Sequence, residues 1–361
     1  MIFKFSKFVM SIILYLIIAL FIFFFFEGLS SSILALTKII KYGSVREKIH
    51  TQYDELLGWI NIPNLYIKDL YGHNIYMKTN SQGFRNSKEF SIRVPEDKIR
   101  IICSGDSFTF GHGVSNDKAW CQALTAFDNR IETVNMGHSG YGIDQAYLLY
   151  MRDGIKLDHN IQVFAFVADD FRRATMQKFS GHFKPVLKTE NGKLVADNVP
   201  PPKISYSAKK IAILQGVLRT QLKSLELIKM VARRIGIKVP GRNVTGKKQF
   251  SNSEEHIRDL ALKIIESLDK VNKKKDSILI AVYLPSRTDY DNEVFWRSFL
   301  AKELQKRGIL FIDLTADFKN YSDSLYKLFI TSHYSPFGNR IVARNIYEKL
   351  LTFPETATLF K

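Results

Sequence analysis

The amino-acid sequence predicts a three-layer α/β/α domain built on a parallel sheet and preceded by a single transmembrane helix. Two observations carry this prediction: short apolar runs alternate with helical patterns between residues 99 and 313, and a run of 19 uncharged residues follows the first seven. Strands that alternate with helices are typical of parallel sheets covered by helices on both faces. The 361 residues, 46% of them hydrophobic, suffice for a large core.

The uncharged run extends from Phe8 to Phe26 and reads FVMSIILYLIIALFIFFFF. A helix of this length rises about 28 Å, close to the hydrocarbon thickness of a bilayer. No convincing small-x-small cleavage site follows Glu27. We therefore expect an uncleaved anchor over residues 1–27 that contacts membrane lipid through residues 8–26, with a cleaved signal peptide as the alternative.

Basic residues flank this run on both sides. Lys4 and Lys7 precede it, and four follow it: Lys38, Lys41, Arg46 and Lys48. By count, the positive-inside rule favours a cytoplasmic C-terminus. Because long C-terminal domains translocate largely regardless of flanking charge, we nevertheless expect a single-pass membrane protein with an extracytoplasmic domain.

Residues 28–95 are predicted to form a stalk and a segment of small strands. Ser30 to Lys48 has a helical pattern, and Tyr53 to Phe90 alternates short apolar pieces with Asn, Gly and Pro. Within this segment TNSQGFRN, from Thr79 to Asn86, predicts a turn. The remaining residues, 96–361, would form the main domain.

The main domain begins with the alternation itself. Apolar runs typical of strands are Ile99–Cys103, Ile131–Asn135, Gln162–Val167, Ser277–Tyr283 and Leu310–Asp313. Helical spacing is found at Ala119–Phe127, Asp144–Asp153, Glu254–Val271 and Glu293–Arg307. Because helices separate consecutive strands, the strands are expected to be parallel.

One segment, residues 172–250, is too long for a connection and is predicted to be an insertion. Its first half carries Asn-Gly between alternating runs, a hairpin signal, and closes on three prolines. Its second half spaces apolar residues from Ile211 to Ile235 as a helix with a basic opposite face. This helix would lie on an anionic membrane, border a cleft for a polyanionic glycan, or dock on the core.

Composition and cysteine content narrow the class of protein. The formal net charge is +17, which favours anionic partners or simply solubility. The basic stretch has few interleaved aromatic residues, so no nucleic acid is expected, and no metal-binding cluster or phosphate loop is evident. The two cysteines, Cys103 and Cys121, form no zinc motif, and the apolar run around Cys103 favours a buried thiol over a disulfide.

Two separated motifs carry the candidate chemistry. SGDSFTFGHG, from Ser104 to Gly113, places Ser107 where a predicted strand ends and a helix begins, the usual site of chemistry in open α/β sheets. Such a serine is also a common helix N-cap, and it is a weak nucleophile without a base. Near the C-terminus, ITSHYSPFGNRIVA places His333 on a loop before the last helical pattern. We expect His333 to act as the base of Ser107.

These motifs resemble those of the SGNH/GDSL hydrolases over residues 80–350. SGDSFTFG resembles the first block, VNMGHSGYGIDQ the second, FAFVADDF the third and SHYSPFGNRIVA the last, and TNSQGFRN resembles a segment found ahead of the first block in membrane-linked members. The resemblance implies a flavodoxin-like α/β/α fold, the nucleophile Ser107 and the base His333. It also implies an oxyanion hole formed by Ser107, Gly140 and the third-block position Asp169, with Asp106 and Asp170 as neighbours of the blocks.

Two residues depart from the family pattern. Asp169 stands where the family has an asparagine, and an ionised carboxylate cannot donate a hydrogen bond to an oxyanion. Alternatively, Asp169 and Asp170 cap the segment that follows or pair with Arg172 and Arg173. The family also carries an aspartate two or three residues before the histidine, where this chain has Thr331 and Ile330. Ser332, a backbone carbonyl or a distant carboxylate such as Asp323 would then have to orient His333.

The resemblance implies a serine ester hydrolase that takes an acyl group, most simply acetyl, from a cell-envelope glycan through an acyl-enzyme. No cofactor is expected. An O-acyltransferase with the same site is one alternative, because the two activities differ only in the acceptor of the acyl group. A glycan-binding protein that has lost the chemistry is the other, and the two departures favour it.

Overall fold

The computed structural model describes residues 2–42, 50–203, 222–234, 252–287, 294–321 and 324–361. The chain divides into two compact units. One holds residues 1–49 and 205–249, and the other holds residues 50–204 and 250–361. The candidate active-site residues all lie in the second unit.

The first unit contains the predicted apolar helix. Helix α1 (Ile2–Tyr42) has a stretch, Met10–Leu34, that is long and apolar enough to cross a membrane, as a single anchor or a signal sequence would be. The predicted stalk continues this helix as far as Tyr42. Of the predicted basic helix, α7 (Lys223–Arg234) is described and packs on α1, where the backbone N–H of Ser224 donates to Glu27 at 3.1 Å. The rest of the predicted basic helix lies outside the described residues.

The second unit is built on a five-stranded parallel sheet, as the sequence predicts. The strands are β5 (Ile99–Ser104), β6 (Ile131–Asn135), β7 (Ile161–Phe166), β12 (Ile278–Tyr283) and β13 (Leu310–Asp313). Their order is β13-β12-β7-β5-β6, with every neighbouring pair parallel. When the five strands are numbered along the chain and the sheet is read from β6 to β13, the order is 2-1-3-4-5, which is the flavodoxin-like order. Each predicted strand agrees with its observed bounds to within one residue.

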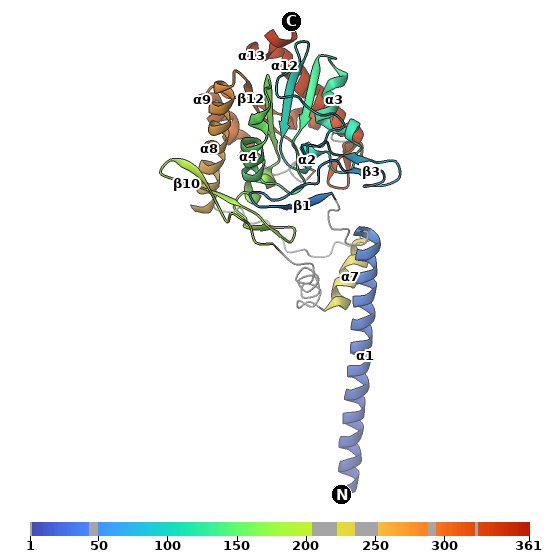
Figure 1. Ribbon diagram of the computed structural model, residues 1–361. Coiled ribbons are helices and arrows are strands. Elements are labelled where there is room, and N and C mark those ends of the chain that lie inside the picture. The colour runs from blue at the N-terminus through green and yellow to red at the C-terminus, as the bar shows by residue number, and fades with distance from the viewer. Residues whose placement is uncertain (1, 43–49, 204–221, 235–251, 288–293, 322–323) are drawn as a thin grey trace. The chain divides into compact units, whose positions relative to one another are not determined.

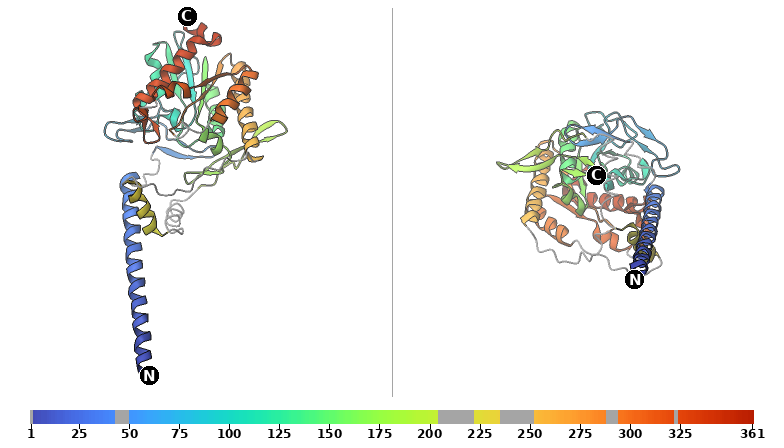
Figure 2. Two further views of the ribbon diagram at one scale, coloured as in Figure 1. Left: turned by 180° about the vertical axis from the view of Figure 1, so that it is seen from behind. Right: turned by 90° about the horizontal axis from the view of Figure 1, so that it is seen from below.

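Helices cover both faces of this sheet (Figures 1 and 2). Those on one face are α4 (Ile143–Arg152), α8 (Asn252–Lys274) and α9 (Val294–Lys306), and those on the other are α3 (Trp120–Ala123) and α12 (Pro336–Thr352). Side chains alternate between the two cores along a strand, so Ile102 enters the first and Ile101 the second. The predicted helix over 119–127 is shorter than expected: α3 has one turn, flanked by 3₁₀ turns at Asn116–Lys118 and Leu124–Ala126.

Small strands and single-turn helices fill the connections. The antiparallel pairs are β1 (Thr51–Asp54) with β2 (Gly58–Asn61), β3 (Tyr66–Ile67) with β4 (Met77–Lys78), β8 (Lys178–Phe179) with β9 (His182–Phe183), β10 (Val186–Glu190) with β11 (Lys193–Asp197), and β14 (Phe329–Ile330) with β15 (His333–Tyr334). The short helices are α2 (Ser107–Phe110), α5 (Ala168–Arg173), α10 (Thr315–Lys319), α11 (Leu325–Leu328) and α13 (Pro354–Ala357). The predicted insertion hairpin is confirmed as β10–β11, with Asn191 and Gly192 both at positive φ in its turn.

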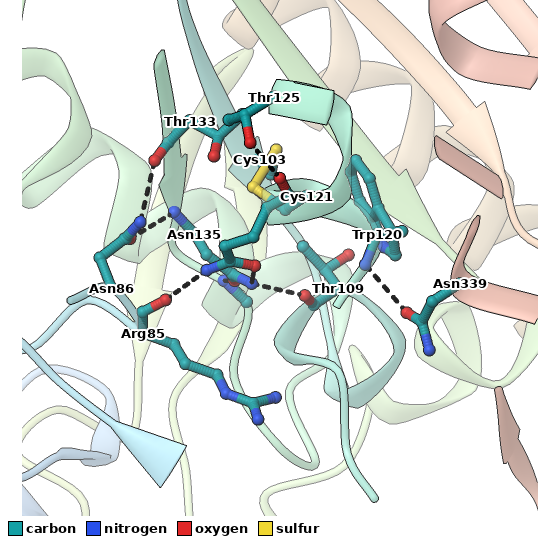
Figure 3. The surroundings of a disulfide bond; sticks show 12 residues. Arg85, Asn86, Cys103, Thr109, Trp120, Cys121, Thr125, Thr133, Asn135 and Asn339 are labelled. Carbon is teal, nitrogen blue, oxygen red and sulfur yellow. Dashed lines mark hydrogen bonds between the residues drawn. A yellow bond between two sulfur atoms is a disulfide. The ribbon is translucent and has the colours of Figure 1, made fainter. Parts of the chain in front are cut away.

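The two cysteines are joined, which corrects the expectation of a buried free thiol. Cys103 at the end of β5 and Cys121 in α3 form a disulfide across a Cα separation of 6.2 Å (Figure 3). Both side chains are fully buried in the same core. The apolar run around Cys103 thus predicts its burial correctly, whereas the approach of α3 to that strand is a tertiary feature that 18 residues of spacing do not reveal.

Candidate active site

The structure brings Ser107 and His333 together from opposite ends of the second unit. His333 Nε2 lies 2.8 Å from Ser107 Oγ, although 226 residues separate them. Ser107 is the first residue of α2, directly after the carboxyl end of β5, and His333 opens β15 just before α12. Ser107 is 7% exposed, so its hydroxyl is nearly shielded from bulk water. This is the geometry of a nucleophile and its base.

The turn that carries Ser107 is fixed by local sequence. Asp106 caps α2 by accepting from the N–H of Phe108 at 2.8 Å, and Gly111 ends the helix in the left-handed conformation. A side chain at Gly105 would place its Cβ 2.3 Å from the carbonyl oxygen of Ala165 in β7. Glycine therefore lets the nucleophile turn lie against the neighbouring strand.

Arg85, in the TNSQGFRN segment, stabilises this turn through hydrogen bonds to its backbone. Its fully buried guanidinium donates to the carbonyls of Phe110, Gly111 and Val114 and to Asn116 Oδ1. Burial lowers the pKa of Arg85 to about 10, so it remains a cation at neutral pH. The sequence indicates only a turn here. Its resemblance to a segment preceding the serine block is the one signal that points to a role for Arg85.

The imidazole of His333 is in contact with two aromatic rings. The ring of Phe108 is 4.9 Å away and that of His112 is 4.5 Å away, centroid to centroid. Burial lowers the pKa of His333, Asp106 raises it and Arg173 lowers it, with a net decrease. The imidazole is therefore neutral at pH 7 and able to accept the serine proton.

The Nδ1 atom of His333 contacts Ser332, one of the three orienting groups considered from the sequence. The Ser332 hydroxyl is 3.2 Å from Nδ1. Asp323, another of those groups, lies outside the described residues. Thr331, which stands near the family's aspartate position, has φ 59° in the turn of the β14–β15 hairpin and directs its hydroxyl to the carbonyl of Ile330 at 2.6 Å. It does not replace an orienting acid.

The predicted oxyanion residue Gly140 lies on a loop beside the nucleophile turn. His138 donates its backbone N–H to the carbonyl of Gly105 at 3.0 Å, and the Trp59 indole N–H donates to the carbonyl of Ser139 at 3.1 Å. Gly140 itself has φ +82°, which favours glycine. A Cβ at Gly137 would lie 2.2 Å from the backbone nitrogen of Phe110, so this loop and α2 are in direct contact.

Asp169 does not supply a hydrogen-bond donor. Its carboxylate accepts from Arg172 Nε at 2.9 Å and from Arg173 Nε at 3.0 Å, as the alternative interpretation of the sequence proposes. Burial would raise the pKa of Asp169, but Arg173 and Arg172 lower it below its ordinary value. Asp169 is therefore ionised and committed to these arginines.

Arg173 is a site residue that sequence reasoning noted only as an ion-pair partner. Its Nη1 lies 3.1 Å from Asp106 Oδ2 and 2.8 Å from Asp170 Oδ1, and donates to the carbonyl of Tyr141 at 2.8 Å. Asp106 Oδ2 is in turn 3.2 Å from Ser107 Oγ. The buried guanidinium of Arg173 therefore contacts three segments: the nucleophile turn, the loop of Gly140 and helix α5.

No family model and no curated protein matches this chain. Solved structures similar to it include a lipolytic protein of the G-D-S-L family from Veillonella parvula DSM 2008, at 16% identity and a TM-score of 0.39 over 69% of this chain and 97% of that one. An acetyl xylan esterase is similar at 14% identity and a TM-score of 0.41, over 70% and 99% of the two chains. A variant of an acetyl-xylooligosaccharide esterase from Geobacillus follows at 14% identity and a TM-score of 0.40, over 71% and 96%. At these values the likeness says nothing about the chemistry of this chain.

Proposed function

We propose that this chain is a serine ester hydrolase that forms an acyl-enzyme at Ser107. The observation that carries the proposal is the 2.8 Å contact between Ser107 Oγ and His333 Nε2. His333 takes the hydroxyl proton as Oγ attacks the ester carbonyl, and returns it to the departing alcohol. Water, deprotonated by the same imidazole, then attacks the acyl carbon and releases the acid.

The backbone N–H groups of Ser107 and Gly140 are the proposed oxyanion donors. The position of the loop that carries Gly140, against the nucleophile turn, supports this assignment. Asp169 adds no donor, and a missing oxyanion donor typically costs about a hundredfold to a thousandfold in rate. We therefore expect a slower enzyme than one with an asparagine at this position.

The proposed substrate is an O-acyl ester, in particular an acetyl ester, of a cell-envelope glycan. The apolar helix α1 supports a location at a membrane if it is retained as an anchor, and the Cys103–Cys121 disulfide supports an oxidising compartment. Together they favour an extracytoplasmic domain, in spite of the four basic residues that follow the apolar run. An enzyme anchored on the outer side of the membrane would be in contact with the glycans of the cell envelope.

Fluorophosphonate labelling tests the proposal, because the reagent modifies only an activated serine. The full-length protein in lipid nanodiscs would be compared with Ser107→Ala and His333→Ala by intact mass. Ser91→Ala, at an exposed serine outside the site, is the matched control. One adduct in the wild type and the control, and none in the two site variants, is expected. A folded wild type that takes no label would overturn the proposal and leave a non-catalytic glycan-binding protein.

If Ser107 is labelled, the next question is which molecule accepts the acyl group from the acyl-enzyme. An acetylated oligosaccharide would be incubated with the enzyme in the presence of an unacetylated one. Free acetate as the main product supports a hydrolase, whereas acetyl groups on the second sugar would show that an acyltransferase uses the same site.

A further inference from the structure

A cavity of about 350 Å³ lies outside the candidate active site. Its walls are the β1–β2 hairpin, the turn at residues 82–84, and the end of α4 with the 3₁₀ turn that follows, Gly154–Lys156. None of the side chains that line it contacts Ser107 or His333 among the described interactions. A volume of this size lies in the range of small-molecule sites.

The most informative group in this cavity is the side chain of Asn61, which is 3% exposed. Its amide Nδ2 donates to the carbonyl of Gly83 at 3.2 Å, which fixes the orientation of the amide. Its Oδ1 is buried and has no hydrogen-bond partner among the described residues. Buried acceptors are normally satisfied, so this oxygen is one that a donor such as the hydroxyl group of a bound molecule could satisfy.

The charged residues in the cavity cancel one another. Arg152 contacts Asp54 at 2.7 Å and Asp153 at 2.7 Å, and Lys156 contacts Asp153 at 3.1 Å. Two cations therefore face two anions, all within ion pairs. The cavity has no excess charge with which to select an ionic ligand.

Other residues that line the cavity contribute amide and apolar groups. Gln52 and Gln82 add side-chain amides that can both donate and accept, and Ile60 and Phe84 add apolar surface. Gln52 and Ile60 are cross-strand partners, so they share one face of the hairpin. A neutral ring with hydroxyl groups on its edge and C–H groups on its faces matches this combination.

We infer that this cavity is a binding site for a neutral sugar residue of a glycan. The inference deepens the proposed function, on which it rests for the choice of a glycan over other hydroxylated molecules. The layer that forms the cavity also supports the active site, because Trp59 of β2 binds the loop of Gly140 and Arg85 follows Phe84 directly. The cavity would hold a part of the glycan away from the ester.

Filling the cavity provides the test. Gln52 is exposed and lies in a strand, where tryptophan is well tolerated, so Gln52→Trp is expected to fold and to occupy the cavity. Gln305→Trp, at an exposed position of α9, is the matched control. Both changes would be made in full-length Ser107→Ala protein, so that no ester chemistry intervenes. Nanodiscs without maltoside detergent avoid competition from a sugar headgroup.

Binding would be measured by calorimetry and by ligand-observed NMR with xylotetraose, cellotetraose and chitotetraose, and with tetragalacturonate as the anionic comparison. We expect at least one neutral tetrasaccharide to bind, Gln52→Trp to weaken it at least tenfold, and Gln305→Trp to leave it unchanged. Failure of every neutral tetrasaccharide to bind, or equal binding by Gln52→Trp, would overturn the inference. Preference for tetragalacturonate would also overturn it.

The two proposals fail separately. If fluorophosphonate labels Ser107 but no neutral tetrasaccharide binds, the hydrolase stands and the sugar site is wrong. If a tetrasaccharide binds at the cavity but the serine takes no label, the sugar site stands and the hydrolase is wrong.

Discussion

The β14–β15 hairpin allows an orienting acid to be restored opposite His333. Ile330 is the direct cross-strand partner of His333, and it is 46% exposed, so replacing it with aspartate removes little buried surface. Side chains directly opposite each other on paired strands have Cβ atoms about 4.5–5.5 Å apart. A carboxylate in Ile330→Asp therefore lies within reach of the imidazole, which now contacts only the Ser332 hydroxyl at Nδ1 among the described hydrogen bonds.

The gain follows from the difference between the two hydrogen bonds. A neutral hydrogen bond contributes about 0.5–1.5 kcal/mol and one to a charged group about 1.5–3 kcal/mol. The difference of about 1–1.5 kcal/mol, realised as the imidazolium forms, corresponds to a rise in kcat of roughly 5- to 13-fold. The new negative charge also raises the pKa of His333, so the acidic limb of the rate profile moves to higher pH.

The assay is hydrolysis of 4-nitrophenyl acetate across a pH series, together with an NMR titration of the His333 ring. Ile330→Asn is the matched control, because asparagine has nearly the same shape as aspartate but carries no charge. We expect Ile330→Asp to raise both kcat and the pKa of His333, and Ile330→Asn to raise neither. Equal behaviour of the two variants would refute the reasoning that His333 lacks an orienting acid.

Three further outcomes are expected. Asp169→Ala should change kcat less than tenfold, because its carboxylate binds two arginines, and a hundredfold loss in kcat would contradict this. The acidic limb of kcat/KM should lie below pH 6.5, because burial lowers the pKa of His333 and the base is active only when neutral; a limb above pH 6.5 would contradict this. Changing Cys103 and Cys121 together to serine should lower the free energy of unfolding by about 3 kcal/mol, measured by denaturant titration, whereas an unchanged midpoint would speak against the disulfide.

The sheet was predictable because each strand is a short, mainly apolar run that lies between turn residues and helical patterns. Ile99–Ser104 and Ile161–Phe166 are buried at every position, as expected for central parallel strands covered on both faces. The helix expected over residues 119–127 is less regular: α3 ends at Ala123, and the 3₁₀ turn Leu124–Ala126 follows it before β6 begins at Ile131. The spacing of apolar residues over so short a segment does not distinguish one long helix from consecutive turns.

The site was predictable only in part. The two motifs indicated Ser107 and His333, and the structure brings these side chains within 2.8 Å of each other. The roles of Arg85 and Arg173 depend on contacts with backbone carbonyls and carboxylates that are distant in sequence. The contact between the rings of His112 and His333 likewise joins residues far apart in the chain. The spacing of apolar residues along the chain predicts which face of a helix or strand a residue occupies, but it does not predict which distant residues that side chain contacts.

The acid that orients the histidine in a catalytic triad has two tasks, and different groups beside His333 can serve each of them. An orienting acid fixes the tautomer of the histidine and stabilises the imidazolium that forms during acyl transfer. Ser332 contacts Nδ1 and can serve the first task, but it carries no charge. Asp106 lies beside Ser107 and raises the pKa of His333, so its field serves the second, while Arg173 opposes it. Because Arg173 forms an ion pair with Asp106 and weakens its field, the proposed reaction would proceed with less stabilisation of the imidazolium that it creates.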